Sequence, residues 1–370
     1  MIEEKGKSTP FRILSIDGGG IRGIIPARFL CELEARISKR DGGQARLCDY
    51  FDLICGTSTG GIIAIGLALG MSANEVLELY DANAQKIFGH WHWTITTPKN
   101  IRRVSHSKHS SVGLTSVLKA AFAPYSGGAD DTRIGHAKTR LAIPAYVASS
   151  GHTRVFKTSH NAELSRDYQV PAYQVALATS AAPTFFPAHT FEYFDSLSQT
   201  KNTLTNLVDG GIFANNPAMI GYSEAIALDR PVESLKILSL GTGSETFKEP
   251  FASDRFYNLR PAWGATYWMN PFNGPPLVEM MMQANSEIVD NTLKILSRGV
   301  GNTPRRLFQY DRLQVKFDSN KERVGLDTTH KKKLNFLKEK GKELYDQYGT
   351  QIVADYFTEK IVPYSPSFSL

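Results

Sequence analysis

The chain has 370 residues, 42% of them hydrophobic, which is enough to bury a sizeable core. Its formal charge of +6 favours an anionic partner, which would be a lipid surface or nucleic acid. The alternative is a basic protein without such a partner. The polar N-terminus lacks the apolar core of a signal peptide, and the most apolar run, residues 60–70, is too short to span a bilayer.

The first 70 residues predict alternating strands and helices. Phe11–Ile16 is a short apolar run typical of a buried strand. A helix follows, with Pro26 suited to its first turn and residues 41–43 (D-G-G) at its end. Tyr50–Cys55 predicts a second strand, and Gly61–Leu69 a helix that is apolar on every side and therefore buried. This alternation predicts an α/β fold with a mainly parallel sheet.

The rest of the chain continues this pattern less regularly. Further strands are expected at Arg140–Ala148, Leu204–Val208, Leu235–Leu240 and Leu307–Val315. Residues 88–112 mix aromatic and basic side chains, and residues 246–285 are rich in aromatic residues, Pro, Gly and Met. Residues 331–360 predict a charged helix whose inner face carries Leu334, Leu337, Leu344 and Tyr345. Because no linker is evident, we expect one domain at 8–330 and a helical extension at 331–370 packed on it.

A glycine-rich loop follows the first strand and is built to bind negative charge. Gly18, Gly20 and Gly23 have the G-x-G-x-x-G spacing of a dinucleotide site. Such a site needs an acidic residue at the end of the second strand, where Cys55 and Gly56 stand instead. A kinase-type phosphate loop would need Lys in place of Ile24. We therefore expect no bound cofactor, and the anion is better explained as a transient oxyanion.

Residues 56–60 read G-T-S-T-G, which is the G-x-S-x-G nucleophile elbow. The motif lies between a predicted strand and a predicted helix, where it has to be to expose a serine on a sharp turn. The positive end of that helix points at the serine oxygen. Ser58 is therefore the candidate nucleophile, the alternative being an ordinary strand-to-helix turn.

Ser58 needs a base, and the nine histidines offer poor candidates. Most lie in polar stretches or stand alone, and His330 heads a charged run. Asp209 is the better candidate, because it ends the strand before Gly210-Gly211, as Ser58 follows a strand end. Burial would raise its pKa from about 3.9 toward that of a useful base. The alternative is an aspartate in a common Asp-Gly turn.

These motifs together resemble the patatin-like phospholipase family. The resemblance runs from about residue 11 to residue 315 and rests on three ordered blocks with two further matches, namely residues 17–23 (D-G-G-G-I-R-G), 56–60, 209–211, 178–187 and 239–243. It implies a three-layer α/β/α fold and a Ser-Asp dyad without histidine. Ser58 would be the nucleophile and Asp209 the general base, while Gly18, Gly19, Gly20 and Arg22 would form the oxyanion hole.

The resemblance also implies a substrate and a setting. We expect a phospholipid membrane surface as partner, approached from the cytoplasm at the inner face, and no nucleic acid polymer or metal. The three cysteines, an odd number without metal-ligand spacing, fit a reducing cytosol. The aromatic and Met-rich residues of 246–285 could line an acyl channel, and the basic residues Lys99, Arg102, Arg103 and Lys108 could meet anionic headgroups.

Three matters stay open at the level of sequence. The opening motif is similar to that of bacterial patatin-like effectors of anti-phage defence, which implies activation by a cyclic dinucleotide and allows a homodimer. Plant storage patatins and other lipases open similarly. An esterase, thioesterase or acyltransferase acting on other acyl donors is the alternative enzyme, and a lipid-binding module that kept the fold is the alternative without catalysis.

Overall fold

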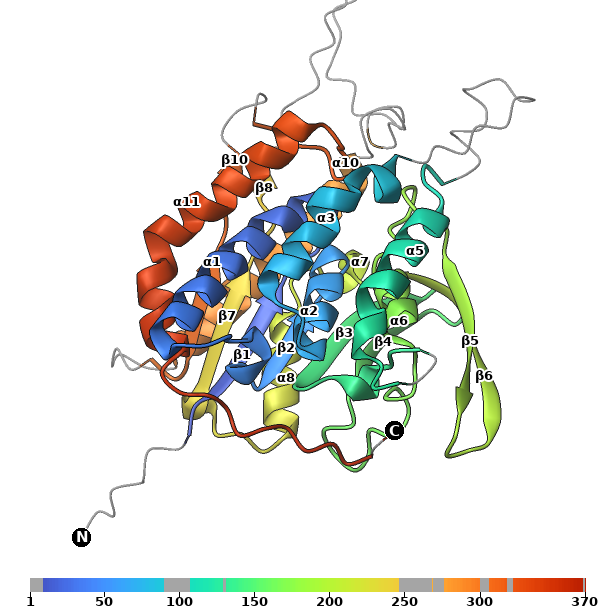
Figure 1. Ribbon diagram of the computed structural model, residues 1–370, viewed down its shortest axis with the longest axis horizontal. Coiled ribbons are helices and arrows are strands. Elements are labelled where there is room, and N and C mark those ends of the chain that lie inside the picture. The colour runs from blue at the N-terminus through green and yellow to red at the C-terminus, as the bar shows by residue number, and fades with distance from the viewer. Residues whose placement is uncertain are drawn as a thin grey trace, which may run out of the picture.

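An eight-stranded, mainly parallel sheet forms the middle layer of a three-layer α/β/α fold (Figure 1). The computed structural model describes residues 9–89, 107–128, 131–245, 268, 276–299, 306–317, 322–368 and 370. The strands of the sheet are β1 (Phe11–Ile16), β2 (Leu53–Gly56), β3 (Arg140–Val147), β4 (His152–Lys157), β5 (His189–Asp195), β6 (Thr200–Asp209), β7 (Leu235–Leu240) and β9 (Gln309–Leu313). A separate small pair joins β8 (Ser244–Glu245) and β10 (Lys316–Phe317).

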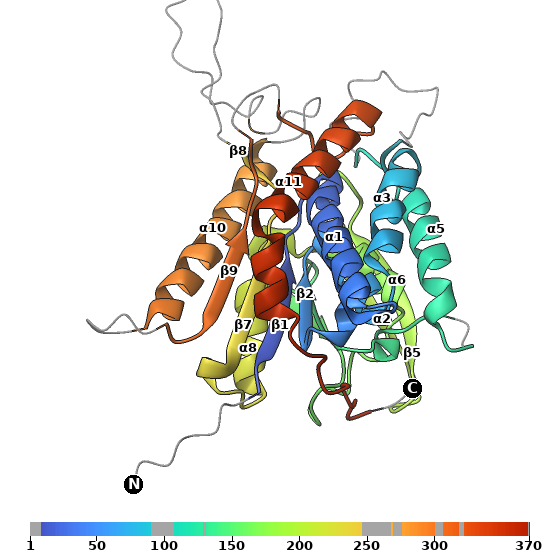
Figure 2. The ribbon, with the colours of Figure 1, turned by 60° about the vertical axis from the view of Figure 1, so that its left-hand side comes forward.

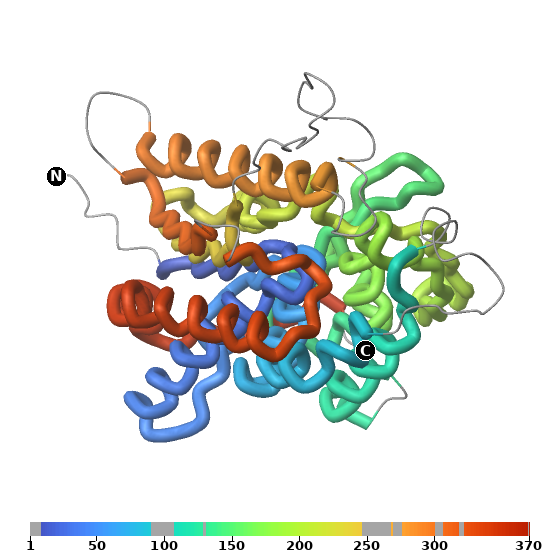
Figure 3. Tube along the Cα trace, turned by 90° about the horizontal axis from the view of Figure 1, so that it is seen from above, coloured from blue at the N-terminus to red at the C-terminus, as the bar shows by residue number. Residues whose placement is uncertain are grey.

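Helices cover both faces of the sheet. They are α1 (Ile24–Asp41), α2 (Thr59–Leu69), α3 (Ala73–Phe88), α5 (Ser111–Phe122), α6 (Ala172–Thr179), α7 (Gly211–Ala214), α8 (Ala218–Ala227), α10 (Pro276–Arg298) and α11 (Lys331–Tyr356). Short 3-10 turns lie at Gly20–Gly23 (η1), Leu47–Asp49 (η2), Ala123–Tyr125 (η3), Ile134–His136 (η4) and Val232–Ser234 (η5). Figures 2 and 3 show α1, α3 and α11 on one side of the sheet and α10 on the other.

The order of strands is β5-β6-β3-β2-β1-β7-β9, with β4 beside β3. The pairs β3–β2, β2–β1, β1–β7 and β7–β9 are parallel, as the alternation of strands and helices predicts. The strands β4, β5 and β6 run antiparallel to their neighbours. The parallel part therefore carries the N-terminal motifs, and the antiparallel part carries Asp209.

Strands β2 and β6 share one edge of β3. Strand β4 occupies the opposite edge, where it pairs with β3 from Ala142 to Val147. On the other edge, β2 pairs with the first half of β3, where Cys55 lies opposite Ala142, and β6 pairs with the second half, where Asp209 lies opposite Ala145. The carboxyl ends of β2 and β6 consequently meet end to end. Pro144 lies between the two pairings, at a point where proline has no N–H to give to a ladder.

The expected buried helix is α2, whose residues are all buried. It approaches β1 so closely that a Cβ on Gly60 would lie 2.2 Å from the Ile16 carbonyl oxygen, so only glycine fits there. The first predicted helix is α1, which ends at Asp41 with Gly42 in the left-handed region. These two helices fix the ends of β1 and β2, from which the glycine loop and the serine elbow emerge.

Several elements differ from expectation. The predicted strand at 204–208 is the longer β6, and the one at 307–315 is β9. Helix α3 was not predicted, although Ser72 and Glu75 form a capping box at its start. The two stretches expected to be irregular contain part of α5 and the beginning of α10, while residues 90–106 and most of 246–275 lie outside the described part of the chain. Helix α11 places Leu334, Leu337 and Leu344 in the core, with Tyr345 packed beside them.

Candidate functional site

Ser58 lies on the sharp turn between β2 and α2. Its φ of 54° and ψ of −124° are unusual for a residue with a side chain, and they identify the strained conformation of a nucleophile elbow. Thr179 holds the turn, because its Oγ1 accepts a hydrogen bond from the Ser58 N–H at 3.0 Å and donates one to the Pro144 carbonyl at 2.6 Å. The G-x-S-x-G motif thus has the local structure that the sequence predicts.

Asp209 ends β6 and is almost fully buried, at 1% exposure. Its Oδ1 accepts a hydrogen bond from the Gly211 N–H at 2.7 Å, and its own N–H donates to the Ala181 carbonyl at 3.0 Å. Among the described residues, Oδ2 has no hydrogen-bond partner. This oxygen is therefore a buried acceptor that is free to take a proton.

Burial raises the pKa of Asp209 from 3.8 to about 7, as expected from the sequence. The Ser58 hydroxyl and the Gly211 N–H lower it by smaller amounts. The Ser58 hydroxyl therefore lies close to the Asp209 carboxylate. Such contacts commonly tighten only when substrate binds. The sequence correctly predicts that Asp209 ends a strand. It reaches Ser58 because β2 and β6 share one edge of β3, and not because their strands are parallel, as predicted.

The glycine loop lies against Ser58. A Cβ on Gly18 would lie 3.1 Å from the Ser58 Cβ and 2.4 Å from the Asn215 Oδ1, so a side chain at that position would close the site. The Gly18 N–H donates to the Asn215 carbonyl at 3.1 Å and is occupied. Of the three predicted glycine donors, Gly19 and Gly20 remain as candidates for an oxyanion. Gly20 has a φ of 54°, the left-handed conformation that glycine adopts without strain.

The side chain of Arg22 lies in a buried ion-pair cluster. Its Nη2 lies 2.7 Å from Glu245 Oε1 and 3.3 Å from Glu279 Oε2, and its Nε donates to the Val324 carbonyl. Burial, and the neighbouring Glu245, raise the pKa of Glu279 to about 7. The guanidinium thus has carboxylate partners, and its predicted part in the oxyanion hole stays a prediction. The two glutamates lie far from Arg22 in sequence, and no motif indicated them.

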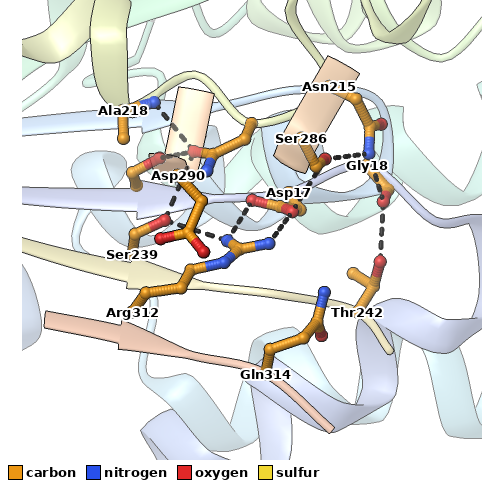
Figure 4. A network of polar contacts seen from close by, with 12 residues as sticks. Asp17, Gly18, Asn215, Ala218, Ser239, Thr242, Ser286, Asp290, Arg312 and Gln314 are labelled. Carbon is orange, nitrogen blue, oxygen red and sulfur yellow. Dashed lines mark hydrogen bonds and ion pairs between the residues drawn. The ribbon is translucent and has the colours of Figure 1, made fainter. Parts of the chain in front are cut away.

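Asp17 forms a second buried ion pair directly before the glycines. Its two carboxylate oxygens accept hydrogen bonds from Arg312 at 2.7 and 2.6 Å, and Ser286 donates a third at 3.1 Å (Figure 4). Arg312 comes from β9 and also donates to Ser239 on β7. This network ties the start of the glycine loop to the far edge of the sheet. The sequence left Asp17 without a role.

A narrow apolar cavity of about 40 Å³ opens beside Ser58 and Asp209. Its apolar lining comes from α2, α3, α5, α10 and two loops, and the main residues are Ile62, Tyr80, Ile87, Phe88, Leu114, Phe185, Phe186, Met282 and Leu326. The described residues that line it include no histidine. Sequence reasoning missed most of this lining, because apolar residues on buried helices carry no signal of their own.

A second cavity of about 630 Å³ lies on the other side of the glycine loop and is lined largely by polar side chains. Gly18, Gly19 and Thr242 belong to its wall, and Met282 and Leu326 belong to both cavities. The loop is therefore a partition between a polar and an apolar space. Within the described part of the chain, no three His, Cys, Asp or Glu side chains are arranged to hold a metal ion.

Two predicted surfaces include residues outside the described part of the chain. Of the basic residues, Lys99, Arg102 and Arg103 lie outside the described residues, and Lys108 forms an ion pair with Asp327. Of the proposed acyl-channel residues, Trp263, Tyr267, Met269 and Phe272 lie outside them as well. Met282 lines the apolar cavity, whereas Met281 is 48% exposed. No helix in the ranges that the structure describes is long and apolar enough to cross a membrane.

Comparison with known proteins gives the class that this fold and site define. Residues 14–222 match the family model described as patatin-like phospholipase. The chain therefore belongs to the patatin-like phospholipase family and is a lipid acyl hydrolase.

Named relatives include plant and bacterial proteins. "Patatin-like protein 2" of Oryza sativa subsp. indica is 33% identical over 373 residues, covering 86% of each chain. A "cGAMP-activated phospholipase" of Vibrio cholerae serotype O1 is 35% identical over 285 residues, covering 75% of each chain. Among solved structures, VipD from Legionella pneumophila aligns with a TM-score of 0.40 and 12% identity, over 91% of this chain and 67% of that one.

Proposed function

We propose that the protein hydrolyses fatty-acyl esters of membrane phospholipids, with Ser58 as nucleophile and Asp209 as general base. The Ser58 Oγ bonds to the ester carbonyl carbon while its proton moves to Asp209 Oδ2. Collapse of the tetrahedral intermediate breaks the bond to the lysolipid oxygen, which takes that proton. Water then attacks the acyl-enzyme, giving its proton to Asp209, and the fatty acid leaves as the proton returns to Ser58.

The negative oxygen of each tetrahedral intermediate needs donors fixed in advance, each worth about 3–4 kcal/mol. We assign this part to the backbone N–H groups of Gly19 and Gly20. Gly18 and Arg22, which the resemblance places in the same site, would instead hold the loop, since the Gly18 N–H and the Arg22 guanidinium have other partners. The apolar cavity beside Ser58 would take the start of the acyl chain.

The observation that carries this proposal is the state of Asp209. An ordinary aspartate is too weak a base for a serine hydroxyl, because its pKa lies about three units below neutral pH. Burial raises the pKa of Asp209 to about 7, and its Oδ2 is unpartnered beside Ser58. A purely structural carboxylate would instead be paired, as Asp17 is with Arg312.

Activity is expected to rise with pH up to about 7 and then level off, since Asp209 acts only when it has lost its proton. The measurement is kcat/KM for a soluble short-chain ester between pH 5 and 9, with the Ser58→Ala protein as the background. A midpoint near pH 4 would show that Asp209 titrates as an ordinary carboxyl and would contradict the assignment.

The function is tested on lipid. Wild type, assayed both alone and with a panel of cyclic dinucleotides, is expected to release fatty acid from vesicles of phosphatidylethanolamine and phosphatidylglycerol under at least one of these conditions. Under the same condition, Ser58→Ala is expected to lose at least roughly 1000-fold in rate. A fluorophosphonate probe should label wild type and spare the variant. Ester hydrolysis without vesicle hydrolysis would favour the esterase alternative, and equal rates in the two proteins would refute Ser58 as nucleophile.

We further propose that a cyclic dinucleotide switches the enzyme on at the inner membrane surface, as part of antiviral defence. The support is the similarity to the "cGAMP-activated phospholipase" of Vibrio cholerae, together with the formal charge of +6. Vesicle hydrolysis measured with and without a panel of cyclic dinucleotides tests it. Equal rates throughout would remove this form of regulation and leave the hydrolase intact.

A further inference from the structure

We infer that Thr242 is a positioning residue for catalysis, whose hydroxyl turns the peptide between Gly18 and Gly19 so that the Gly19 N–H faces Ser58. This inference rests on the proposed function, because it assigns the orientation of an oxyanion donor. Thr242 lies in the S-L-G-T-G stretch (residues 239–243), which begins at the end of β7. This stretch is part of the resemblance to the patatin-like family, but no role could be predicted for it from the sequence.

The contact is short and buried. The Thr242 Oγ1 donates to the Gly18 carbonyl oxygen at 2.7 Å, and Thr242 is 4% exposed (Figure 4). Asn215 Nδ2 lies 3.4 Å from the same oxygen, which makes it a weak second donor. Because β7 pairs with β1 and Leu240 lies opposite Ile16, the loops that carry Thr242 and Gly18 leave neighbouring strands at the same level. The sheet therefore fixes the distance between them.

The direction of the Gly19 N–H follows from the planar peptide. In a trans peptide the C=O of one residue and the N–H of the next point in opposite directions, and the described chain has no cis peptide bond. Thr242 is part of the wall of the polar cavity, and its hydrogen bond holds the Gly18 carbonyl oxygen on that side of the loop. The Gly19 N–H then points the other way, toward the side of the loop on which Ser58 lies.

The positions of the two glycines support this geometry. A Cβ on Gly19 would lie 2.2 Å from the Thr242 Oγ1, whereas a Cβ on Gly18 would lie 3.1 Å from the Ser58 Cβ. The first added carbon would also lie against the hydroxyl that holds the peptide, and the second would lie 2.4 Å from the Asn215 Oδ1, so the two glycines have different neighbours. A peptide between two glycines rotates easily, because neither residue has a side chain to resist it. Rotation would turn the Gly18 oxygen toward the developing negative charge, and the Thr242 hydroxyl prevents it by donating to that oxygen.

The test replaces the hydroxyl and keeps the shape. Thr242→Val is expected to lower kcat for a soluble ester roughly 10- to 100-fold with KM changed less than about threefold, because the donor acts mainly on the transition state. Thr242→Ser, which keeps the donor, is expected to recover most of kcat. Thr203→Val, at an exposed position on β6, is the matched control and should behave as wild type. A Thr242→Val kcat within about twofold of wild type would overturn the inference.

A second measurement needs no turnover and separates the two proposals. Amide hydrogen exchange of the segment 17–22 is expected to be faster in Thr242→Val than in wild type or Thr242→Ser. If exchange changes as expected but wild type hydrolyses no ester, the proposed function fails and the positioning of the peptide stands. If exchange and kcat are both unchanged in an active enzyme, the inference about Thr242 is wrong and the function stands.

Discussion

The Asp209→Asn variant is expected to lose ester hydrolysis by at least roughly 1000-fold and to unfold at a higher temperature than wild type at pH 8. Asparagine cannot take the serine proton, which explains the first effect. It keeps an oxygen for the Gly211 N–H and carries no charge, which explains the second. A residue kept for function at the expense of stability gives this pair of changes.

The sign of the stability change follows from the pKa of Asp209. Folding raises it from 3.8 to about 7, so the folded protein favours the protonated form. The contribution of Asp209 to stability is full below pH 3.8 and is lost as pH rises through about 7. A rise of this size is equivalent to roughly 4 kcal/mol, which is an upper bound for the gain in Asp209→Asn.

Thermal unfolding between pH 4 and 9 measures this effect. The gain should be small at pH 4 and should be complete at pH 8. Ser58→Ala is the control for activity, because it also abolishes hydrolysis but leaves the carboxylate in place. An Asp209→Asn protein that is inactive and less stable than wild type at pH 8 would show that the carboxylate has a structural role.

The Arg312→Met variant is expected to lower the free energy of unfolding by about 3–5 kcal/mol, because it leaves the Asp17 carboxylate buried without its cation. The two side chains are 5% and 2% exposed, so water cannot replace the lost partner. Urea unfolding monitored by circular dichroism measures the loss. The double variant with Asp17→Asn is expected to recover part of it, since no buried charge then lacks a partner.

Lys201→Met provides the matched control for this experiment. Lys201 pairs with Glu192 on the exposed hairpin of β5 and β6, where the two side chains are 69% and 49% exposed. Solvent screens such a pair, and its loss is expected to cost less than about 1 kcal/mol. If both variants lowered the free energy of unfolding by a similar amount, the buried ion pair of Asp17 and Arg312 would contribute no more to stability than an exposed one.

The sequence predicts those parts of the site that follow from local chain geometry. A serine between glycines after an apolar strand needs a sharp turn, so the place of Ser58 could be predicted from five residues. The glycine loop could be predicted in the same way, because its glycines directly follow an apolar strand. Asp209 was found through its Asp-Gly-Gly motif, although the direction of β6 was not, because strand direction depends on pairing with distant β3.

The parts that the sequence does not predict depend on long-range contacts. Glu245 and Glu279 become partners of Arg22 only in the folded chain, and a lone glutamate carries no sign of such a partner. Helix α3 is different, because its capping box and apolar spacing are local features of the sequence, and the prediction overlooked them. The wall of the apolar cavity combines α3 with segments as distant as Leu326, so no local pattern describes it.

Under the proposed function, the end-to-end meeting of β2 and β6 on β3 ties catalysis to the completion of folding. Moving the pairing of β6 by one residue would displace Asp209 by about 3.3 Å and turn it to the opposite face of the sheet. Ser58 and Asp209 thus come together only when β6 has docked in the register that places Asp209 opposite Ala145. A chain still being synthesised carries Ser58 long before Asp209, so under the proposed function it would hold the nucleophile without its base.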